Sequence, residues 1–240
     1  MTDADLAAAL AETAGRLLVT LRAGGTLTGA ALGDAGDATA NAYLLSAIRA
    51  LRPDDAVLSE EDVDDLARLA ARRVWIVDPL DGTREYADGR DDWAVHVALS
   101  VDGHAAVGAV ALPAQGLTLR SDQPPPTPAR PPRARMLVSR TRPPAECRRL
   151  ADRLDAELIP MGSAGAKAMA VVLGRGDIYF HTGGQREWDN AAPVAVALGA
   201  GLVASRVDGS PCTYNARDTL VPDLLICAPE WEARVRAALA

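Results

Sequence analysis

The sequence predicts an α/β protein with an α+β first half and an α/β second half. In the first half, residues 93–100 alternate large apolar with small or polar side chains, and Asp102-Gly103 supplies a turn into a partner strand, which together predict an antiparallel hairpin. In the second half, four short strand candidates are interleaved with four helix candidates, a pattern that favours helices packed on a sheet. The chain has 240 residues, enough for one large domain or two compact ones.

Three helical segments are predicted before the hairpin. The first has leucines and alanine at helical spacing over residues 10–21 and is expected to end at Gly24-Gly25. The second is amphipathic and is expected to run from about Asp37 to Leu51. The third is an acidic stretch over residues 62–71. We therefore expect the helices of this half to pack beside its strands.

Strands are predicted at four places in the same half. A short strand covers residues 56–59, and a β-branched run covers residues 74–77. The second of these is expected to stop at Asp78-Pro79, because proline cannot donate to a central ladder. The hairpin strands cover residues 93–100 and 104–112.

A proline-rich stretch separates the two halves. Residues 123–132 include six prolines and no aliphatic side chain larger than alanine, which is typical of a stiff linker or an exposed loop. We therefore predict a metal-binding α+β subdomain over residues 1–122 and a substrate-binding α/β subdomain over residues 133–240. The second-half elements are expected to be strands at 136–139, 157–159, 177–180 and 224–227 and helices at 143–154, 164–173, 189–200 and 229–240.

Composition excludes several classes of protein. Hydrophobic residues at 49% and charged residues at 24% are typical of a globular chain. Aromatic residues at 4% and a net charge of −7 argue against nucleic-acid binding, which uses stacking side chains and basic surfaces. If such an acidic chain handles a phosphorylated substrate, bound metal has to supply positive charge.

Cellular location is predicted from the cysteines and the N-terminus. Cys147, Cys212 and Cys227 fit neither a disulfide framework nor a zinc site. The first 25 residues lack the basic start and the continuous apolar run of a signal peptide, and no segment reaches the roughly 18 apolar residues of a membrane span. We expect a cytoplasmic protein without a membrane partner.

The strongest chemical signal is the run Asp78-Pro79-Leu80-Asp81-Gly82-Thr83. A buried strand brings Asp78 to its end and Asp81 returns three residues later, so both carboxylates and the carbonyl between them can converge on one hard cation. Gly82 and Thr83 then offer backbone N–H groups to a phosphate if a helix begins there. The alternative is that Asp78 caps a turn closed by Asp81-Gly82.

Three weaker acidic signals accompany this run. Glu60-Glu61 follows the first predicted strand, although it can equally begin a solvated acidic face that continues to Asp65. Asp189 opens an apolar helix and can serve simply as its N-cap. Asp37, near the start of the second predicted helix, is open to the same objection. Each signal alone is weak, and their combination is specific.

Taken together, these motifs resemble the lithium-sensitive, magnesium-dependent phosphatase superfamily that includes inositol monophosphatase, fructose-1,6-bisphosphatase and 3′(2′),5′-bisphosphate nucleotidase. That superfamily has an acidic pair after a strand, an Asp-Pro-(Ile/Leu)-Asp-Gly-Thr run and a late Trp-Asp-x-Ala-Ala run. Here they stand in order as Glu60-Glu61, residues 78–83 and residues 188–192. The resemblance spans residues 37–209 and implies a layered αβαβα sandwich with the site between its halves.

The resemblance also implies roles for individual residues. Two or three Mg²⁺ ions are expected, and lithium is expected to inhibit the enzyme. The implied metal ligands are Glu60, Asp78, the carbonyl of Leu80, Asp81 and Asp189. Asp37 and Thr83 are implied to orient the attacking water, so the catalytic residues are expected to be Asp37, Glu60 and Thr83.

Two segments point to the substrate branch. The metal run continues as Arg84-Glu85-Tyr86, which is similar to the Lys/Arg-Glu-Phe of CysQ-type bisphosphate nucleotidases and unlike the Thr-Asn-Phe of inositol monophosphatases. Residues 162–167 match the family's substrate-contacting segment, where nucleotidases place a lysine, and Lys167 is the single lysine among 25 basic residues. A lysine at a helix surface is the alternative. The expected substrate-binding residues are Asp81, Gly82, Thr83, Gly162, Ser163, Ala164, Lys167 and Asp189.

The resulting functional prediction is magnesium-dependent hydrolysis of the 3′-phosphate of 3′-phosphoadenosine 5′-phosphate to AMP and phosphate in sulfur assimilation, with 3′-phosphoadenylyl sulfate as a related substrate. The alternatives are inositol 1-phosphate or fructose 1,6-bisphosphate as the substrate, and a non-catalytic nucleotide sensor. Many relatives are dimers, so a homodimer is possible. Structural or surface roles are expected for His96, His104 and His181.

Overall fold

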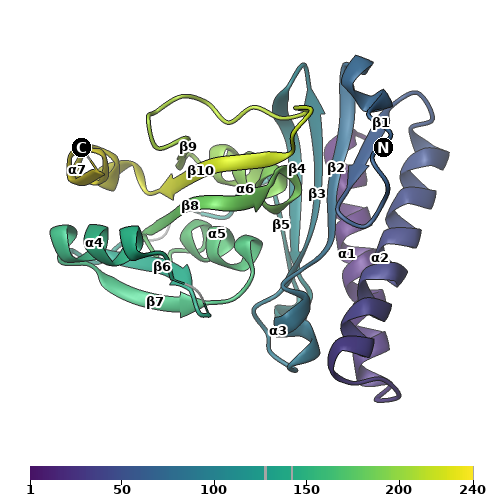
Figure 1. Ribbon diagram of the computed structural model, residues 1–240, viewed down its shortest axis with the longest axis horizontal. Coiled ribbons are helices and arrows are strands. Elements are labelled where there is room, and N and C mark those ends of the chain that lie inside the picture. Colours follow the sequence, from purple (N-terminus) through teal and green to yellow (C-terminus); the bar gives the residue numbers. More distant parts are fainter. Residues whose placement is uncertain (127–128, 142, 240) are drawn as a thin grey trace.

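The computed structural model describes residues 1–126, 129–141 and 143–239, and it forms five stacked layers of helices and sheets (Figure 1). The outer helices α1 (Asp3–Ala23) and α2 (Gly29–Leu51) cover one face of the first sheet. Helices α5 (Ala164–Val172) and α6 (Glu187–Gly199) lie between the two sheets, and α4 (Ala145–Leu154) and α7 (Pro229–Leu239) pack together on the far side of the second sheet. The predicted αβαβα sandwich is confirmed.

The first sheet has the strand order β1-β2-β3-β4-β5. β1 and β2 are parallel, and the remaining neighbours are antiparallel. The predicted hairpin is its centre, β3 with β4. The short helix α3 (Thr83–Ala87) and the 3₁₀ turns η1 (Ala67–Ala70) and η2 (Pro113–Gln115) lie along its connections. The strands are β1 (Ala56–Ser59), β2 (Arg73–Asp81), β3 (Ala94–Val101), β4 (His104–Leu112) and β5 (Leu117–Arg120).

The second sheet is mixed, with the order β7-β6-β8-β10-β9. β6 is parallel to both β7 and β8, whereas β10 is antiparallel to β8 and β9. This arrangement agrees with the strand and helix alternation of the second half. The strands are β6 (Arg135–Ser139), β7 (Glu157–Met161), β8 (Ile178–Arg186), β9 (Val203–Ser205) and β10 (Leu220–Cys227).

The hydrophobic core is continuous across the proline-rich stretch. One buried cluster joins Ile76 and Ala98 of the first sheet to Met136 and Tyr179 of the second. Residues 123–132 do connect the last strand of the first sheet to the first strand of the second, although residues 127 and 128 lie outside the described part. The division into two subdomains stays a prediction, and no helix among the described residues is long and apolar enough to cross a membrane.

The second helix begins earlier than expected, at Gly29 rather than near Asp37. The sequence hides this start because glycines disfavour helices. Two of them are required by packing: a Cβ at Gly33 would lie 2.8 Å from the methyl group of Thr83, and one at Gly36 would lie 3.0 Å from the side chain of Leu80. Asp37 therefore lies within the helix, beside the segment that carries the metal motif.

Two further expectations around the motif are wrong. Residues 62–71 form no α-helix and contain only the turn η1, because side chains of Asp64 and Asp65 accept hydrogen bonds from nearby backbone N–H groups. β2 does not stop at Asp78-Pro79 but continues to Asp81, with a register shift between Asp78 and Asp81. Such a bulge accommodates a proline that cannot donate to the ladder.

Two strands of the second half are longer than expected. β8 runs on to Arg186, well beyond the expected end at residue 180, and β10 begins earlier, at Leu220. The short strands β5 and β9 were not expected, since three or four residues give too little pattern to recognise. Helix α7 was expected to reach Ala240, which lies outside the described residues.

Candidate active site

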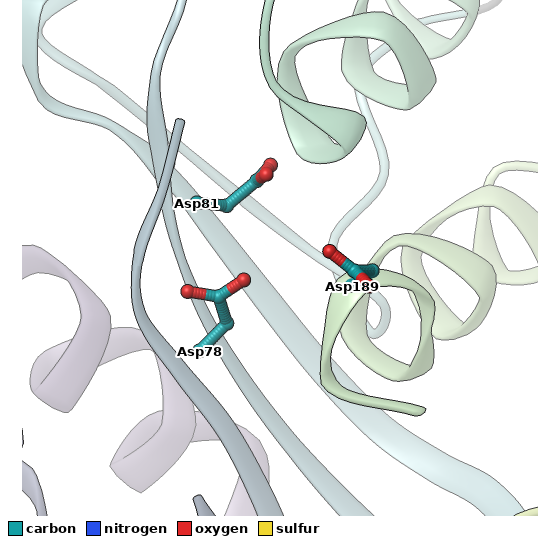
Figure 2. Close-up of side chains that lie close together, drawn as sticks. All are labelled: Asp78, Asp81 and Asp189. Atoms are coloured by element: carbon teal, nitrogen blue, oxygen red, sulfur yellow. The ribbon is translucent and has the colours of Figure 1, made fainter. Parts of the chain in front are cut away.

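Three aspartates, two from β2 and one from α6, meet between these two elements. Asp78 and Asp81 lie on the bulged end of β2, and Asp189 lies in the first turn of α6 (Figure 2). Each offers a carboxylate oxygen, and these oxygens lie within 4.8 Å of one another. The structure thus brings together three of the expected metal ligands, which are 111 residues apart at their extremes in sequence. Oxygen donors of this kind suit a hard divalent cation.

Asp78 is the most deeply buried of the three, with 1% of its surface exposed. Its Oδ1 accepts a hydrogen bond of 3.1 Å from the backbone N–H of Leu80, whereas Oδ2 has no hydrogen-bond partner among the described residues and lies 4.0 Å from Nδ1 of His96. Burial raises the pKa of this carboxyl well above its usual range, and the charges of Glu60 and Asp81 raise it further. An unpartnered buried oxygen among like charges is what a bound cation would satisfy, so the residues fit a metal.

Asp81 is held firmly from the opposite side. Its carboxylate accepts hydrogen bonds from Ser163 Oγ and from the backbone N–H groups of Ala164, at 3.1 Å, and Gly165, at 2.6 Å. Burial works to raise the pKa of Asp81, but the neighbouring imidazole of His96 and these donors outweigh it, so the pKa is lowered. The residue therefore stays ionised and ready to bind a cation.

Asp189 and Glu60 complete the acidic side of the site. Oδ2 of Asp189 accepts from the backbone N–H of Arg186 at 2.5 Å, which leaves Oδ1 for the shared space. Burial and the charge of Asp81 raise the pKa of Asp189 to about 6. Loss of hydration and the charges of Asp189 and Asp81 raise the pKa of Glu60 to about 7. Among the described residues, Glu60 is not part of the group within 4.8 Å, and it lies at the exposed edge of the site.

The predicted pair Asp37 and Thr83 is adjacent. Thr83 Oγ1 lies 3.4 Å from Asp37 Oδ1 and 3.1 Å from the carbonyl oxygen of Leu80. Burial and the charge of Glu61 raise the pKa of Asp37 to about 7. The hydroxyl therefore connects a carboxylate that titrates near neutral pH to the carbonyl expected to bind metal.

A cavity of about 320 Å³ opens beside the triad. Its walls come from both halves of the chain, and they combine the acidic groups with cationic and aromatic side chains. A hollow of about 510 Å³ lies elsewhere, between α1 and β5, but it contains no acidic cluster of this kind. The site cavity is lined by Asp81, Gly82, Thr83, Gly162, Ser163, Ala164, Lys167 and Asp189, with Arg84, Glu85, Ser139, Arg140, Thr141, Tyr179, His181 and Gln185.

Lys167 is 6% exposed and lies over the ring of Tyr179, with Nζ 5.3 Å from the ring centroid. Its ammonium donates to the carbonyl oxygens of Gly162, at 2.9 Å, and Ser163. Burial lowers the pKa of Lys167, and Asp81 and Glu85 partly offset that effect. Because an ammonium has three donors, one remains for the cavity that the side chain lines.

The backbone of residues 162–165 is already engaged by protein carboxylates. The N–H of Gly162 donates to Asp92 Oδ2 at 2.6 Å, and those of Ala164 and Gly165 donate to Asp81. Ser163 caps helix α5 by accepting from the N–H of Ala166 at 2.9 Å. This segment therefore reaches the cavity mainly through the side chain of Lys167.

Sequence reasoning missed two side chains that border the site. His96 was expected to be structural or at the surface; it is fully buried, and its Nε2 lies 3.2 Å from Asp81 Oδ2. Arg140 donates to Glu85 Oε1 at 2.8 Å and so joins the two halves across the cavity. The contact of Arg140 with Glu85 spans 55 residues, and that of His96 with Trp188 spans 92. Contacts at such separations leave no local signal, although Glu85 is part of the substrate-branch motif.

Comparison with known proteins agrees with this geometry. Residues 8–239 match the inositol monophosphatase family model. A 3′-phosphoadenosine 5′-phosphate phosphatase of Mycobacterium leprae is 53% identical over 95% of this chain and 89% of its own, and the 3′(2′),5′-bisphosphate nucleotidase CysQ of Escherichia coli is 30% identical over 78% and 81%.

Solved structures agree with the fold. An inositol monophosphatase from Zymomonas mobilis superposes with a TM-score of 0.80 at 20% identity, covering 99% of this chain and 97% of its own. CysQ from Bacteroides thetaiotaomicron gives 0.79 at 24% identity, covering 93% and 96%. The layered fold, the acidic site and the family match lead to one conclusion: the chain belongs to the inositol monophosphatase family and is a phosphatase.

Proposed function

We propose that the protein is a magnesium-dependent phosphatase that hydrolyses the 3′-phosphate of 3′-phosphoadenosine 5′-phosphate, giving AMP and phosphate in sulfur assimilation. The observation that carries this proposal is the buried acidic triad of Asp78, Asp81 and Asp189, with the unpartnered oxygen of Asp78, next to a cavity lined by Lys167. The mycobacterial relative, which matches almost the whole chain, supports the substrate. 3′-Phosphoadenylyl sulfate, with the same 3′-phosphate, is a related substrate.

Metal binding falls to the acidic groups. Asp78, Asp81 and Asp189 would hold Mg²⁺, with Glu60 and the carbonyl of Leu80 as further ligands. Bound Mg²⁺ supplies charge neutralisation at the phosphate oxygens and lowers the pKa of a coordinated water. The site requires such cations, since the phosphate dianion would otherwise be repelled by the carboxylates.

Thr83 and Asp37 orient the attacking water and accept its proton. The water forms a new P–O bond and gives up one proton, and the bond from phosphorus to the 3′-oxygen breaks. That oxygen takes a proton from solvent water and leaves as the hydroxyl of AMP, and Asp37 releases the proton it accepted to solvent, so the products are AMP and hydrogen phosphate. Asp37, whose pKa burial raises to about 7, accepts the proton of the water through the hydroxyl of Thr83. Lys167 binds the 5′-phosphate, which does not react, so the substrate is fixed at both of its phosphates.

A substrate panel tests the proposal. Release of inorganic phosphate is measured with 3′-phosphoadenosine 5′-phosphate, inositol 1-phosphate and fructose 1,6-bisphosphate, each with Mg²⁺ and with a chelator. We expect release from the adenosine bisphosphate to be fastest and to stop on chelation. Faster release from inositol 1-phosphate would show that the substrate assignment is wrong. Full activity after chelation would show that the metal assignment is wrong. Binding of the nucleotide without phosphate release would indicate a sensor. A cytoplasmic location and a homodimer remain predictions.

A further inference from the structure

The segment that carries Glu60 is the most exposed part of the site. It follows β1, and every residue from Glu60 to Asp65 is exposed. Within residues 60–72, Arg68 is the single buried residue, with 2% of its surface exposed. A long charged side chain is rarely buried to this extent unless its donors are satisfied. Arg68 is therefore the anchor of this segment.

Arg68 joins its own segment to a distant loop. Its Nε lies 3.1 Å from both carboxylate oxygens of Asp64, and Nη2 donates to Asp64 Oδ2 at 2.6 Å. Nη1 donates to Asn215 Oδ1 at 2.8 Å and to the carbonyl oxygen of Ala216 at 3.0 Å. The planar fork of the guanidinium thus fixes two segments 147 residues apart.

Asn215 returns the contact and extends it to helix α6. Its Nδ2 donates to the carbonyl oxygen of Arg68 at 3.0 Å. Its backbone N–H donates to Glu187 Oε2 at 2.7 Å, and the N–H of Ala216 donates to Glu187 Oε1 at 2.8 Å. Glu187 is 2% exposed and stands two residues before Asp189, in the same first turn of α6. A chain of partly buried hydrogen bonds therefore runs from the Glu60 segment to the turn that carries Asp189.

We propose that Arg68, Asn215 and Glu187 are positioning residues that fix the Glu60 segment against the first turn of α6, and so preorganise the acidic groups for metal. None of the three lines the site cavity. The inference rests on the proposed metal site. Charged groups that repel one another need an outside constraint to stay together before the cation arrives, and this network supplies it from two sides.

Calorimetric titration with Mg²⁺ alone, without substrate, tests the inference. Asn215 has a φ of 64°, so Asn215→Gly keeps the backbone conformation while removing the side chain. We expect Asn215→Gly and Arg68→Met to bind Mg²⁺ about 10-fold more weakly than wild type, in the range seen for groups that orient metal ligands. At saturating Mg²⁺, kcat should return close to the wild-type value. Asn215→Asp, which keeps the acceptor oxygen for Arg68, should recover part of the loss.

Arg49→Met is the matched control. Arg49 ties the same segment through Asp62 at 2.9 Å, but both side chains are exposed, at 64% and 42%, so its loss should leave Mg²⁺ affinity unchanged. Circular dichroism checks that each variant is folded. If Arg68→Met does not fold, the single variants Glu187→Gln and Asn215→Gly test the positioning role instead. Wild-type Mg²⁺ affinity in the folded variants would overturn the positioning role. Absence of Mg²⁺ binding by the wild type would instead remove the proposed metal site.

Discussion

Nε2 of His96 lies 3.2 Å from Oδ2 of Asp81, and both side chains are buried. The other ring nitrogen, Nδ1, lies 3.0 Å from the carbonyl oxygen of Trp188. A carbonyl only accepts, so Nδ1 carries the hydrogen in this contact. Trp188 directly precedes Asp189. The imidazole therefore contacts the carboxylate of Asp81 on one side and the backbone next to Asp189 on the other.

Replacement of His96 should therefore destabilise the metal-free protein. His96→Ala removes the hydrogen bond from Nδ1 to the carbonyl of Trp188 and creates a cavity, which together should lower the free energy of unfolding by roughly 2 to 4 kcal/mol. Urea denaturation at neutral pH in the presence of a chelator measures this change. His104 is exposed, and His104→Ala should alter stability by less than about 0.5 kcal/mol. Equal effects of the two variants would contradict the role of His96.

Asp78→Asn and Asp189→Asn should each lower activity by more than the roughly 100-fold upper range for residues that merely orient metal ligands. The same changes should not unfold the protein. Asp78→Asn should raise the melting temperature in chelator, because it removes a carboxyl whose pKa is raised by burial and by Glu60, and a raised carboxyl pKa costs stability at neutral pH.

Thermal unfolding with and without Mg²⁺ checks both statements. Mg²⁺ should raise the melting temperature of the wild type, since a ligand that binds the folded state stabilises it, and should leave that of Asp78→Asn unchanged. Asp34 is exposed on helix α2, so Asp34→Asn should behave as wild type. A plain capping role for Asp78 would instead cost about 1 kcal/mol of stability with normal turnover.

The sequence predicted the site better where the signal is local. Residues 78–83 stand side by side in the chain, so one strand and one bulge bring Asp78, Asp81 and Thr83 together. The start of α2 at Gly29 was missed because its glycines are set by contacts with Thr83 and Leu80, which lie some 50 residues away. His96 and Asn215 were missed for the same reason: their partners come from other elements, and a side chain's long-range partners leave no periodic pattern.

Thr83→Val should separate water orientation from metal binding. The substitution keeps the volume that packs against Gly33 but removes the hydroxyl that contacts Asp37 and Leu80. We expect kcat to fall by about 10²- to 10⁴-fold, the range for proton transfer by a positioned group, with little change in the Mg²⁺ concentration for half-maximal activity. Thr83→Ser keeps the hydroxyl and should retain most of the activity. A normal kcat for Thr83→Val would exclude the proposed role.

The stability of the folded protein should decrease at acidic pH partly because of Asp55, which is not part of the triad. Burial works to raise its pKa, but hydrogen bonds from Arg73, at 2.7 and 3.0 Å, and from Trp75 Nε1, at 2.8 Å, outweigh it, so the pKa is lowered from 3.8. A lowered pKa stabilises the folded state above the unfolded-state pKa, and this contribution is lost as the pH falls through the folded-state pKa.

The stability difference between wild type and Asp55→Asn should therefore be constant, at roughly 1 to 2 kcal/mol, from neutral pH to about pH 4 and should shrink below it. Urea denaturation across that pH range measures the difference. Asp102→Asn is the matched control, because its ion pair with Arg72 is exposed, at 56% and 75%. A difference that grows on acidification would show that the sign of the linkage is wrong.

We propose that Lys167 makes the enzyme prefer a bisphosphate substrate, but Lys167 also supports the residues around Asp81. A test has to distinguish binding of the second phosphate from this supporting role. Its ammonium holds the carbonyl oxygens of Gly162 and Ser163, and Ser163 in turn contacts Asp81, so Lys167→Ala can disturb the metal site as well as the second phosphate. Loss of a charged hydrogen bond to the 5′-phosphate should lower kcat/KM for 3′-phosphoadenosine 5′-phosphate by about 10- to 150-fold.

A monophosphate tests the supporting role alone, because it has no second phosphate to place at Lys167. If the lysine binds the 5′-phosphate, kcat/KM for 3′-AMP should be nearly equal in wild type and Lys167→Ala, and the calorimetric affinity for Mg²⁺ should be unchanged. Lys167→Arg should restore only part of the activity toward the bisphosphate, since a planar guanidinium does not fill the position of a compact ammonium above Tyr179. Equal losses toward 3′-AMP and the bisphosphate, with weaker Mg²⁺ binding, would assign Lys167 to the support of Asp81 and would leave the bisphosphate specificity to Arg84 and Arg140, which also line the cavity.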